Sequence, residues 1–318
     1  MRTKEYVGVD IAKAKFDVAL SDGDNHWKEK AFDNNPSGYK ALTLWLKKHT
    51  DKPSFVCMEA TGHYGQGLAE YLHKQKIAVS VVNPMQIKHY AKARLTRNKN
   101  DRVDARLIAL YAKQMQPSLF TPKETKHQAV QELAKIADTL SGQVQSLKLQ
   151  YDSIGCKQAR LALKQSINYL QKKMDSLEKK IADHIEAIPT LKEQKQRLLT
   201  IKGIGEKSAH RLLAYLPDLT LFRSAKQLAA FAGLSPRQFQ SGQYQGKTRL
   251  SKFGDARLRK ALYMPALVAK NYNSYFKKVA LRLQDNGLKP KQIICAIMRK
   301  ILHAIFGMFK HQQDFAMS

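Results

Sequence analysis

Several residue types are scarce in this sequence, and each scarcity excludes a class of protein. Only three of the 318 residues are cysteine, and no CxxC pair occurs. The sequence therefore predicts neither a disulfide framework nor a structural zinc site. It has no run of about 18 apolar residues, and its start has neither the apolar centre nor the cleavage site of a signal peptide. We therefore expect no membrane partner and a cytoplasmic location.

Acidic residues are also scarce relative to basic ones. The chain has 55 Lys and Arg residues but only 26 Asp and Glu residues, which gives a formal net charge of +29. A folded protein with this surplus creates a positive field whose commonest partner is nucleic acid. Hydrophobic residues make up 43% of the chain, which is enough for ordinary cores and excludes disorder throughout. The length suits two or three domains.

Residues 1–117 have the pattern of an α/β domain. Three strands separated by short polar turns are predicted first, and two further strands then alternate with helices. The order βββαβαβα favours a mixed sheet with helices on its faces. The predicted strands cover residues 6–11, 15–20, 27–32, 54–59 and 77–82.

Residues 118–190 change to a helical period. Apolar residues follow one another at steps of mostly three and four over residues 133–154 and again over 163–188, with Gly155 between the two stretches. This pattern predicts a long antiparallel helical hairpin or coiled coil. Because an apolar stripe of this length exceeds what the hairpin can cover by itself, we expect the chain to self-associate through it.

Residues 191–318 are predicted to be mainly helical and begin with a glycine-containing turn. Gly203 and Gly205 lie two apart between helix-forming segments, with Lys202 and Lys207 beside them. A tight turn that leads into a helix N-terminus can bind a DNA or RNA phosphate without reading bases, as in a helix-hairpin-helix. The alternative is a helix–helix turn in which the glycines only allow close packing.

Four acidic residues of the first domain are candidates for a metal site. Asp10 interrupts an apolar strand and Glu59 ends the fourth strand, so a sheet that pairs these strands brings the two carboxylates together. Adjacent anions repel each other unless a cation lies between them. Asp101 and Asp104, spaced i and i+3, share one face of a predicted helix. Oxygen ligands without nearby Cys or paired His favour Mg²⁺, with Mn²⁺ as an alternative.

Taken singly, these acids have ordinary explanations. Asp101 follows a polar stretch, as a helix N-cap does, and Glu59 could be a surface residue at a strand end. As a set, they could hold two ions about 4 Å apart that activate a nucleophile and stabilise the leaving oxygen of a phosphodiester. The cations around the two aspartates suit either a polyphosphate or a charge-rich solvated helix: Lys88, Lys92, Arg94, Arg97, Lys99, Arg102 and Arg106.

A polar, glycine-punctuated loop over residues 233–252 contains a candidate nucleophile, Ser241. Cations near a serine can stabilise the charge on a pentavalent phosphorus while the hydroxyl attacks a phosphodiester. Against this, most loop serines are structural, no His/Asp triad is legible beside Ser241, and Tyr244 is a rival nucleophile in the same loop. The cations of this loop are Arg237, Lys247, Arg249 and Lys252.

Taken together, these motifs resemble those of one known family, the DEDD transposases of insertion-sequence family one-ten. The resemblance spans nearly the whole chain, and the order and spacing of the motifs make it specific. It implies a RuvC-like, RNase H-like domain, a coiled-coil linker and a transposase domain with a nucleophilic serine. The motifs are VGVDIAK at 7–13, MEATG at 58–62, NKNDRVDA at 98–105, IKGIG at 201–205 and the Ser241 loop with RLSK at 249–252.

The resemblance also implies residue roles and partners. Asp10, Glu59, Asp101 and Asp104 would hold Mg²⁺, and Ser241 would form a covalent phosphoserine link to DNA. The enzyme would be a prokaryotic, nucleoid-associated recombinase, guided to target and donor DNA by a bridge RNA from the same element. It would dimerise through the coiled coil, form tetramers in the synaptic complex and pass through a Holliday-junction-like intermediate. All four acids and the serine are present.

Other functions fit part of the pattern. A metal-dependent junction nuclease would use the same acids without a covalent intermediate, and Ser241 would then be incidental. A non-enzymatic nucleic-acid-binding protein would explain the charge, but carboxylates beside a phosphate channel would repel its ligand. An actin-like ATPase shares the early strand order, yet it needs further phosphate loops where this chain becomes helical.

Overall fold

The computed structural model divides the chain into two compact units, residues 1–123 and 124–318. The second unit contains both the predicted helical region 118–190, apart from its first residues, and the predicted domain 191–318, and a boundary between these two stays a prediction. The structure describes residues 5–21, 26–60, 64–94, 101–122, 125–237, 240–241, 244–245, 249–251 and 253–316. Within these ranges, the side chains of residues 101, 102, 125, 126, 237, 240, 241, 244, 245 and 249 lie outside the description.

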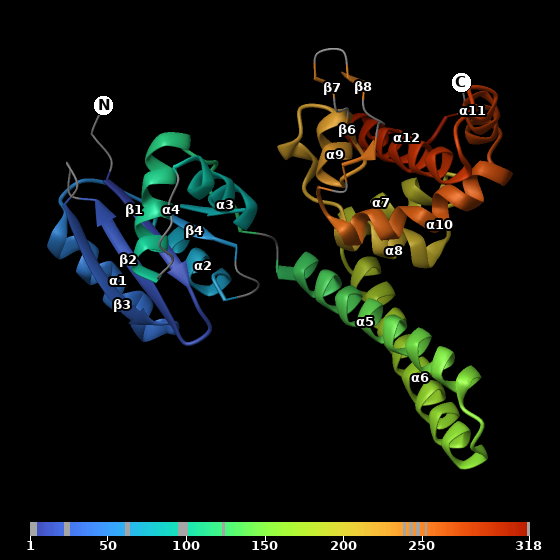
Figure 1. Cartoon of the computed structure of the whole chain (residues 1–318), viewed down its shortest axis with the longest axis horizontal. Coiled ribbons are helices and arrows are strands. Elements are labelled where there is room, and N and C mark those ends of the chain that lie inside the picture. The colour runs from blue at the N-terminus through green and yellow to red at the C-terminus, as the bar shows by residue number, and fades with distance from the viewer. Residues whose placement is uncertain are drawn as a thin grey trace. The chain divides into compact units, whose positions relative to one another are not determined.

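The first unit is built on a five-stranded mixed sheet with the strand order β3-β2-β1-β4-β5 (Figure 1). Strands β1, β2 and β3 pair antiparallel, whereas β4 runs parallel to β1 and β5 runs parallel to β4. The predicted mixed sheet is thus confirmed. The strands are β1 (Glu5–Ile11), β2 (Lys15–Ser21), β3 (Trp27–Asp33), β4 (Ser54–Glu59) and β5 (Ala78–Val82).

Helices cover both faces of this sheet, namely α1 (Pro36–His49), α2 (Gln66–Lys74), α3 (Pro84–Ala93) and α4 (Asp101–Met115). Helices α1 and α2 share a core with Val7 and Met58 on one face. Helices α3 and α4 share a core with Phe55 and Cys57 on the other. Because alternate residues of a strand point to opposite faces, β1 and β4 contribute to both cores and are apolar on both sides.

Helix α4 lies very close to the sheet at Gly8 of β1. A Cβ atom added to Gly8 would lie 1.9 Å from the carbonyl oxygen of Ala105 and 2.5 Å from the backbone nitrogen of Ala109. Both alanines are buried. Only glycine leaves room for the helix backbone at this separation, because any side chain would place a carbon atom inside α4.

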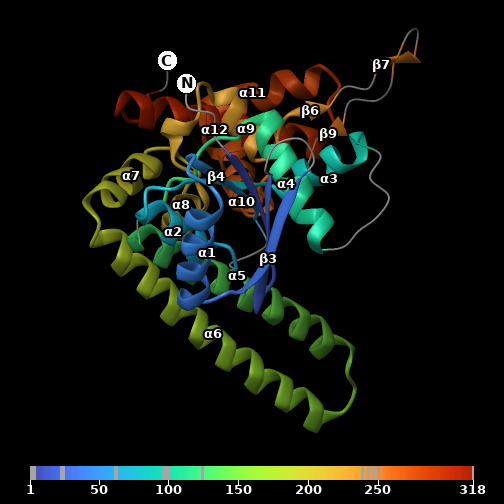
Figure 2. The same ribbon diagram turned by 90° about the vertical axis from the view of Figure 1, so that its left-hand side faces the viewer.

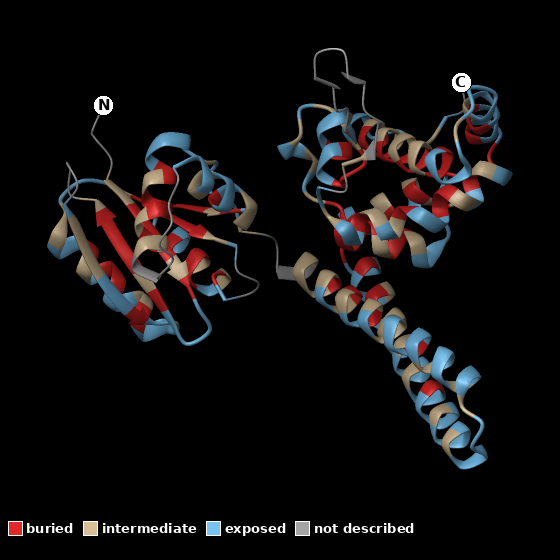
Figure 3. Ribbon diagram, in the orientation of Figure 1, coloured by how far each residue is buried: buried red, intermediate tan, exposed pale blue. Residues whose placement is uncertain are grey.

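The second unit begins with two long helices, α5 (Thr125–Ser153) and α6 (Lys157–Glu186), which pack side by side (Figures 1 and 2). Buried residues gather at the base of this pair, where Val130, Ala134 and Ile181 belong to the core of the unit. The distal half is largely exposed (Figure 3). Two helices therefore lie where the sequence predicts them, while supercoiling into a coiled coil stays a prediction.

Further helices complete the second unit around α12, which is long and apolar enough to cross a membrane by length and composition. It is not an uninterrupted apolar run, because Arg299 and Lys300 lie within it. Ile297, Ile301 and Ile305 of α12 are fully buried in the unit's core, which accounts for its apolar character. The elements are α7 (Pro189–Leu199), α8 (Glu206–Tyr215), η1 (Leu219–Leu221), α9 (Ala225–Phe231), α10 (Ala256–Tyr272), α11 (Ser274–Asp285) and α12 (Pro290–His311).

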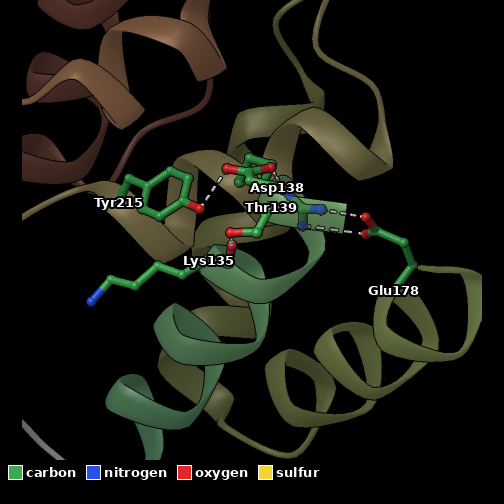
Figure 4. A network of polar contacts seen from close by, with 6 residues as sticks. Lys135, Asp138, Thr139, Glu178 and Tyr215 are labelled. Carbon is green, nitrogen blue, oxygen red and sulfur yellow. Dashed lines mark hydrogen bonds and ion pairs between the residues drawn. The ribbon is translucent and has the colours of Figure 1, made fainter. Parts of the chain in front are cut away.

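A polar network ties the base of the hairpin to α8 (Figure 4). Arg211 of α8 donates from Nε to Asp138 of α5 over 2.9 Å and pairs through Nη2 with Glu178 of α6. Tyr215 donates its hydroxyl to Asp138 over 2.6 Å. Burial, together with this hydrogen bond, raises the pKa of the Tyr215 phenol. These groups are part-buried, and a hydrogen bond to a charged group contributes about 1.5–3 kcal/mol, so the network stabilises the attachment of the hairpin to the helical bundle.

Replacing Gly8 with alanine is expected to destabilise the first unit by about 3 kcal/mol, because the new methyl group would push the backbone of α4 away from β1. Trp27 and Trp45 are the only tryptophans of the chain and both belong to this unit. Tryptophan fluorescence during denaturant unfolding therefore reports on it. Gly142 in α5 has no atom within 4 Å of an added Cβ, so Gly142→Ala is a control that should leave this transition unchanged. An unshifted midpoint in Gly8→Ala would contradict the proposed contact.

Candidate active site

Asp10 and Glu59 lie at the carboxyl ends of two neighbouring parallel strands. The pairing of β1 with β4 ends at Val9 and Met58, so the two acids are the next residues on each strand. Asp10 lies two residues after Gly8, and Glu59 lies two residues after Cys57. Both acids therefore point to the same sheet face as Gly8 and Cys57, which is the face that α4 covers. Both side chains are half-buried. The structure thus brings these two predicted acids to one edge of the sheet, on the face that α4 covers.

Asp104 approaches the same edge from above. Leu107, Ile108, Tyr111 and Ala112 of α4 share a core with Phe55 and Cys57 of β4, and Ala105 and Ala109 lie over Gly8. Figure 1 shows α4 running against the direction of β1, with its first turn toward the carboxyl end of that strand. Asp104 shares its helix face with Ile108, which is buried against the sheet.

Asp101 is the first residue of α4, and its side chain lies outside the described residues. Among the side chains that the structure describes, no three Asp, Glu, His or Cys residues lie close enough to form a metal-binding group. The donors fit Mg²⁺ or Mn²⁺ in kind, because all four are carboxylates. The described side chains of Asp10, Glu59 and Asp104 do not by themselves form a metal-binding group, so a shared site that also includes Asp101 stays a prediction.

Cys57 is the cysteine nearest in sequence to these acids and points to the same face of the sheet as Glu59. Its side chain is fully buried beneath α4. Burial raises the pKa of the Cys57 thiol to about 12, so the sulfur is protonated at neutral pH. Cys57 therefore contributes to the packing between this face of the sheet and α4.

Asp17, which the sequence analysis did not single out, lies directly opposite Asp10. The two are partners in the antiparallel pairing of β1 with β2 and therefore point to the same face. Like charges placed opposite each other are destabilising, and Lys15 offsets part of this repulsion, since its Nζ lies 3.1 Å from Asp17 Oδ2. In the sequence, Asp17 is only one polar residue of an alternating strand, because the register that brings it to Asp10 is not legible there.

The cations near α4 that were predicted to bind nucleic acid are only partly described. Lys92 and Arg94 are exposed at the end of α3. Arg94 donates to the Tyr90 hydroxyl over 3.2 Å and lies over the Tyr90 ring, which holds its charge at the surface. Arg97, Lys99 and the side chain of Arg102 lie outside the described residues.

Arg106 makes two contacts within the first unit. Its Nε pairs with Glu29 of β3, and its guanidinium lies over the ring of Trp27. These contacts tie α4 to the far side of the sheet only two residues after Asp104. Arg106 therefore helps to hold α4 in place, and its role in binding a polyphosphate stays a prediction.

The two glycines of the predicted phosphate-binding turn differ in their surroundings. Gly203 has a φ of +122°, and an added Cβ would lie 2.8 Å from Ala269 of α10, so this glycine serves close packing. Gly205 precedes α8, and nothing lies within 4 Å of an added Cβ. Lys202 and Lys207 are exposed on either side. The packing interpretation thus applies to Gly203, while phosphate binding at Gly205 stays a prediction.

A carboxylate already lies in the first turn of α8. Glu206 Oε2 is 3.4 Å from Lys195 Nζ and 3.5 Å from His210 Nε2. Burial lowers the pKa of His210, so the imidazole is neutral near pH 7. An acid at a helix N-terminus is favoured by the helix dipole, and Glu206 would therefore compete with a phosphate for this turn.

Ser241 lies in a β-ribbon, whereas the sequence predicts an open loop. Strand β6 (Pro236–Arg237) pairs with β9 (Arg249–Leu250), and β7 (Gln240–Ser241) pairs with β8 (Tyr244–Gln245), both antiparallel. Ser241 is the cross-strand partner of Tyr244, and Arg237 that of Arg249. The backbone thus sets the predicted nucleophile opposite its rival. The side chains of these four residues, as well as Lys247 and Lys252, lie outside the described part of the chain.

Comparison with known proteins identifies the family. A DEDD transposase model of the IS110 group matches residues 7–154, and a transposase model of the IS116/IS110/IS902 family matches residues 195–280. A pilin gene-inverting protein of Moraxella bovis is 33% identical over 318 residues, 98% of each chain. The transposase of insertion sequence element IS1111A from Coxiella burnetii is 27% identical over 290 residues, 82% of this chain and 77% of that protein.

A solved structure of Thermus thermophilus RuvC in complex with a Holliday junction substrate covers 37% of this chain and 100% of its own, with 13% identity and a TM-score of 0.29. Because that TM-score is low, the match adds no argument to the strand order that the sheet itself shows. The two family models and the curated relatives define the class of protein, an enzyme of DNA transposition and recombination. Within that class, the chain belongs to the IS110 family of transposases.

The two glycines of the turn before α8 can be separated by mutation. Gly203→Ala is expected to destabilise the second unit by about 2 kcal/mol or more, from backbone strain and the overlap with Ala269. Gly205→Ala should change the free energy of unfolding by less than about 1 kcal/mol but weaken DNA binding several-fold, because the methyl group obstructs a phosphate at the helix N-terminus. Circular-dichroism melts and fluorescence anisotropy with labelled DNA measure the two effects. Wild-type DNA affinity in Gly205→Ala would assign this turn to packing alone.

Proposed function

We propose that this chain is the recombinase of a mobile DNA element and that it cuts and rejoins DNA strands with four acids and one serine. Asp10, Glu59, Asp101 and Asp104 bind Mg²⁺, or alternatively Mn²⁺, and Ser241 is the nucleophile. The observation that carries the proposal is the passage of α4 over Gly8, which directs the first turn of α4 toward the strand ends with Asp10 and Glu59. Membership of a DEDD transposase family supports the use of a divalent cation.

Strand cleavage replaces one phosphoester bond with another. When bound, the divalent cation supplies a Lewis acid that draws charge from the phosphate oxygens. The Ser241 hydroxyl attacks the phosphorus, an Oγ–P bond forms, and the bond from phosphorus to one sugar oxygen breaks. The serine proton leaves to a base and the released sugar oxygen takes up a proton. The DNA end is then held covalently on the protein.

Strand joining is the same reaction in reverse with a different sugar hydroxyl. That hydroxyl attacks the phosphoserine, the Oγ–P bond breaks, and Ser241 regains its proton. One phosphoester bond forms for each bond broken, so exchange between two DNA molecules needs no nucleotide cofactor. A junction nuclease, the alternative reading, would instead let water attack and would leave free DNA ends.

The ribbon around Ser241 supports its role through its backbone pairing. Arg237 and Arg249 are cross-strand partners on β6 and β9, and Ser241 and Tyr244 are cross-strand partners on β7 and β8. Two arginines that are close in sequence to the serine would supply the positive charge that binding a phosphodiester there requires. Lys247 and Lys252 continue the same basic sequence.

The partners in this proposal are target DNA, donor DNA and a bridge RNA. A net charge of +29 attracts all three without distinguishing sequences. Base pairing with a guide RNA would supply the sequence choice that phosphate contacts lack, as in other RNA-guided systems. The RNA part of the proposal rests on the family resemblance alone.

Self-association through the hairpin completes the proposal. The distal half of α5 and α6 presents large apolar side chains to solvent, with Leu149 74%, Leu161 58% and Tyr169 61% exposed. Burying such residues against a second copy would remove them from water. Dimers through this surface, and tetramers when DNA is bound, would bring several acid sites and serines into one assembly.

The proposed chemistry predicts covalent protein–DNA adducts that depend on Ser241. Full-length protein with labelled element-end DNA and its flanking transcript should give adducts that survive denaturing electrophoresis. Ser241→Ala should form none while retaining the RNA that copurifies with wild type, and Asp10→Asn or EDTA should also abolish them. Tyr244→Phe is the matched control and should keep them. Adducts that persist in Ser241→Ala but vanish in Tyr244→Phe would transfer the role to the tyrosine, and cleavage without any adduct would favour the nuclease.

A second candidate function is the inversion of a chromosomal DNA segment. The match to the pilin gene-inverting protein of Moraxella bovis extends over 98% of both chains at 33% identity, whereas the match to the IS1111A transposase covers 82% of this chain. The two functions share one chemistry and differ in their product. With the native locus on a plasmid, amplification across the new junctions should yield excised circles and insertions for a mobile element. A flipped segment that retains both flanks would establish inversion instead.

A further inference from the structure

The strand pairing that aligns Asp10 with Glu59 stops one residue short of them. The paired residues of β1 and β4 end at Val9 and Met58. Asp10 is held by β2, through its pairing with Asp17, and Glu59 is held by β5, through its pairing with Val82. The backbone pairing of β1 with β4 thus ends before the chain reaches Asp10 and Glu59. A different contact is needed to join the two segments after these acids.

Asn34 supplies such a contact. Its Nδ2 atom donates to the carbonyl oxygen of Ala12, which follows β1, over 3.0 Å, and to the carbonyl oxygen of Tyr64, in the connection that follows β4, over 3.0 Å. One carboxamide group therefore joins the segments through which both acid-bearing strands leave the sheet. Together with the Val9–Met58 pair, it encloses Asp10 and Glu59 between two fixed points.

The orientation of the Asn34 amide is itself determined by its neighbours. The Tyr39 hydroxyl donates to Asn34 Oδ1 over 2.9 Å, which leaves the NH₂ group for the two carbonyl oxygens. The backbone nitrogen of Asn34 also donates to the carbonyl oxygen of Ala14 over 2.9 Å. Both ends of the carboxamide and the backbone beneath it are therefore engaged, so the group has one arrangement.

The connection that Asn34 holds lies directly against the acid-bearing strands. A Cβ added to Gly65 would lie 3.1 Å from Ile11 Cδ1, 3.5 Å from Met58 Sδ and 4.0 Å from the carbonyl oxygen of Glu59. The backbone at Gly65 thus lies next to Ile11 of β1 and to Met58 and Glu59 of β4. The hydrogen bond from Asn34 to Tyr64 restrains movement of this connection.

We propose that Asn34, oriented by Tyr39, is a positioning residue for the divalent-cation site, because it fixes the separation of the backbone segments that carry Asp10 and Glu59. The inference rests on the proposed role of these acids as metal ligands. Residues that orient metal ligands without touching the metal typically contribute about 10–100-fold to metal affinity. Asn34 acts through two backbone segments, so its effect belongs to metal binding and not to the attack of the serine on phosphorus.

The test compares Asn34→Asp with wild type in full-length protein, with Mn²⁺ alone as the probe. The variant keeps the size and the acceptor oxygen of Asn34 but replaces the NH₂ donor with an oxygen that repels the carbonyls of Ala12 and Tyr64. The Mn²⁺ concentration that gives half of the maximal rise in melting temperature should increase about tenfold. The Mn²⁺ dependence of covalent adduct formation should shift by a similar factor, with activity largely restored at saturating Mn²⁺.

Asn35→Asp is the matched control, because it adds the same charge one residue away. Asn35 uses its Oδ1 to accept a hydrogen bond from Gly38 N at the start of α1, and aspartate keeps that oxygen. Its Mn²⁺ dependence should equal that of wild type. Tyr39→Phe, whose ring can still pack against Phe16 and Tyr71, should raise the Mn²⁺ requirement by a smaller factor and covers the case in which Asn34→Asp does not fold.

The failure of this inference is distinguishable from the failure of the proposed function. If Asp10→Asn abolishes the Mn²⁺-induced rise in melting temperature while Asn34→Asp and Tyr39→Phe titrate like wild type, the positioning role is wrong and the metal site stands. If Asp10→Asn itself retains the wild-type rise, Asp10 is no metal ligand, and both the site and the inference that depends on it are overturned. Equal shifts in Asn34→Asp and Asn35→Asp would assign the effect to charge and also reject the positioning role.

Discussion

The contact between α4 and the bare backbone of Gly8 is the constraint on which the first unit depends. A helix that lies this close to a strand cannot slide or turn without colliding with it, so the contact fixes both the height and the rotation of α4. The same helix covers one core of the sheet and carries Asp104. Stability and the geometry of the candidate site are therefore set by one packing interaction.

Contacts farther out reinforce that geometry from two sides. Arg106 ties α4 to Glu29 of β3, and Asn34 ties together the segments that follow β1 and β4. The first acts on the helix and the second on the strands. The acids of the candidate site thus lie between elements that are each held by a separate polar contact, which is the arrangement expected where small displacements of a ligand matter.

Much of this could be predicted from the sequence, because periodicity is a local property. The strands and helices of the first unit lie where the apolar spacing predicts them, and the adjacency of Asp10 and Glu59 follows from pairing their strands in parallel. Register and backbone contacts are not local. Asp17 becomes a neighbour of Asp10 only through the β1–β2 register, and Asn34 acts on carbonyl oxygens, which leave no trace in the sequence. A glycine at position 8 indicates that another element can approach the strand closely, but the sequence does not show that this element is α4.

The hairpin of the second unit has a mechanical consequence. Its helices are about 45 Å long, at 1.5 Å per residue, and their base is locked to α8 by Arg211, Asp138 and Glu178. A rod anchored in this way transmits torque: a force applied at its tip rotates the body to which it is fixed instead of bending the joint. A partner bound to the far end of the hairpin would thereby rotate the hairpin and the helical bundle together.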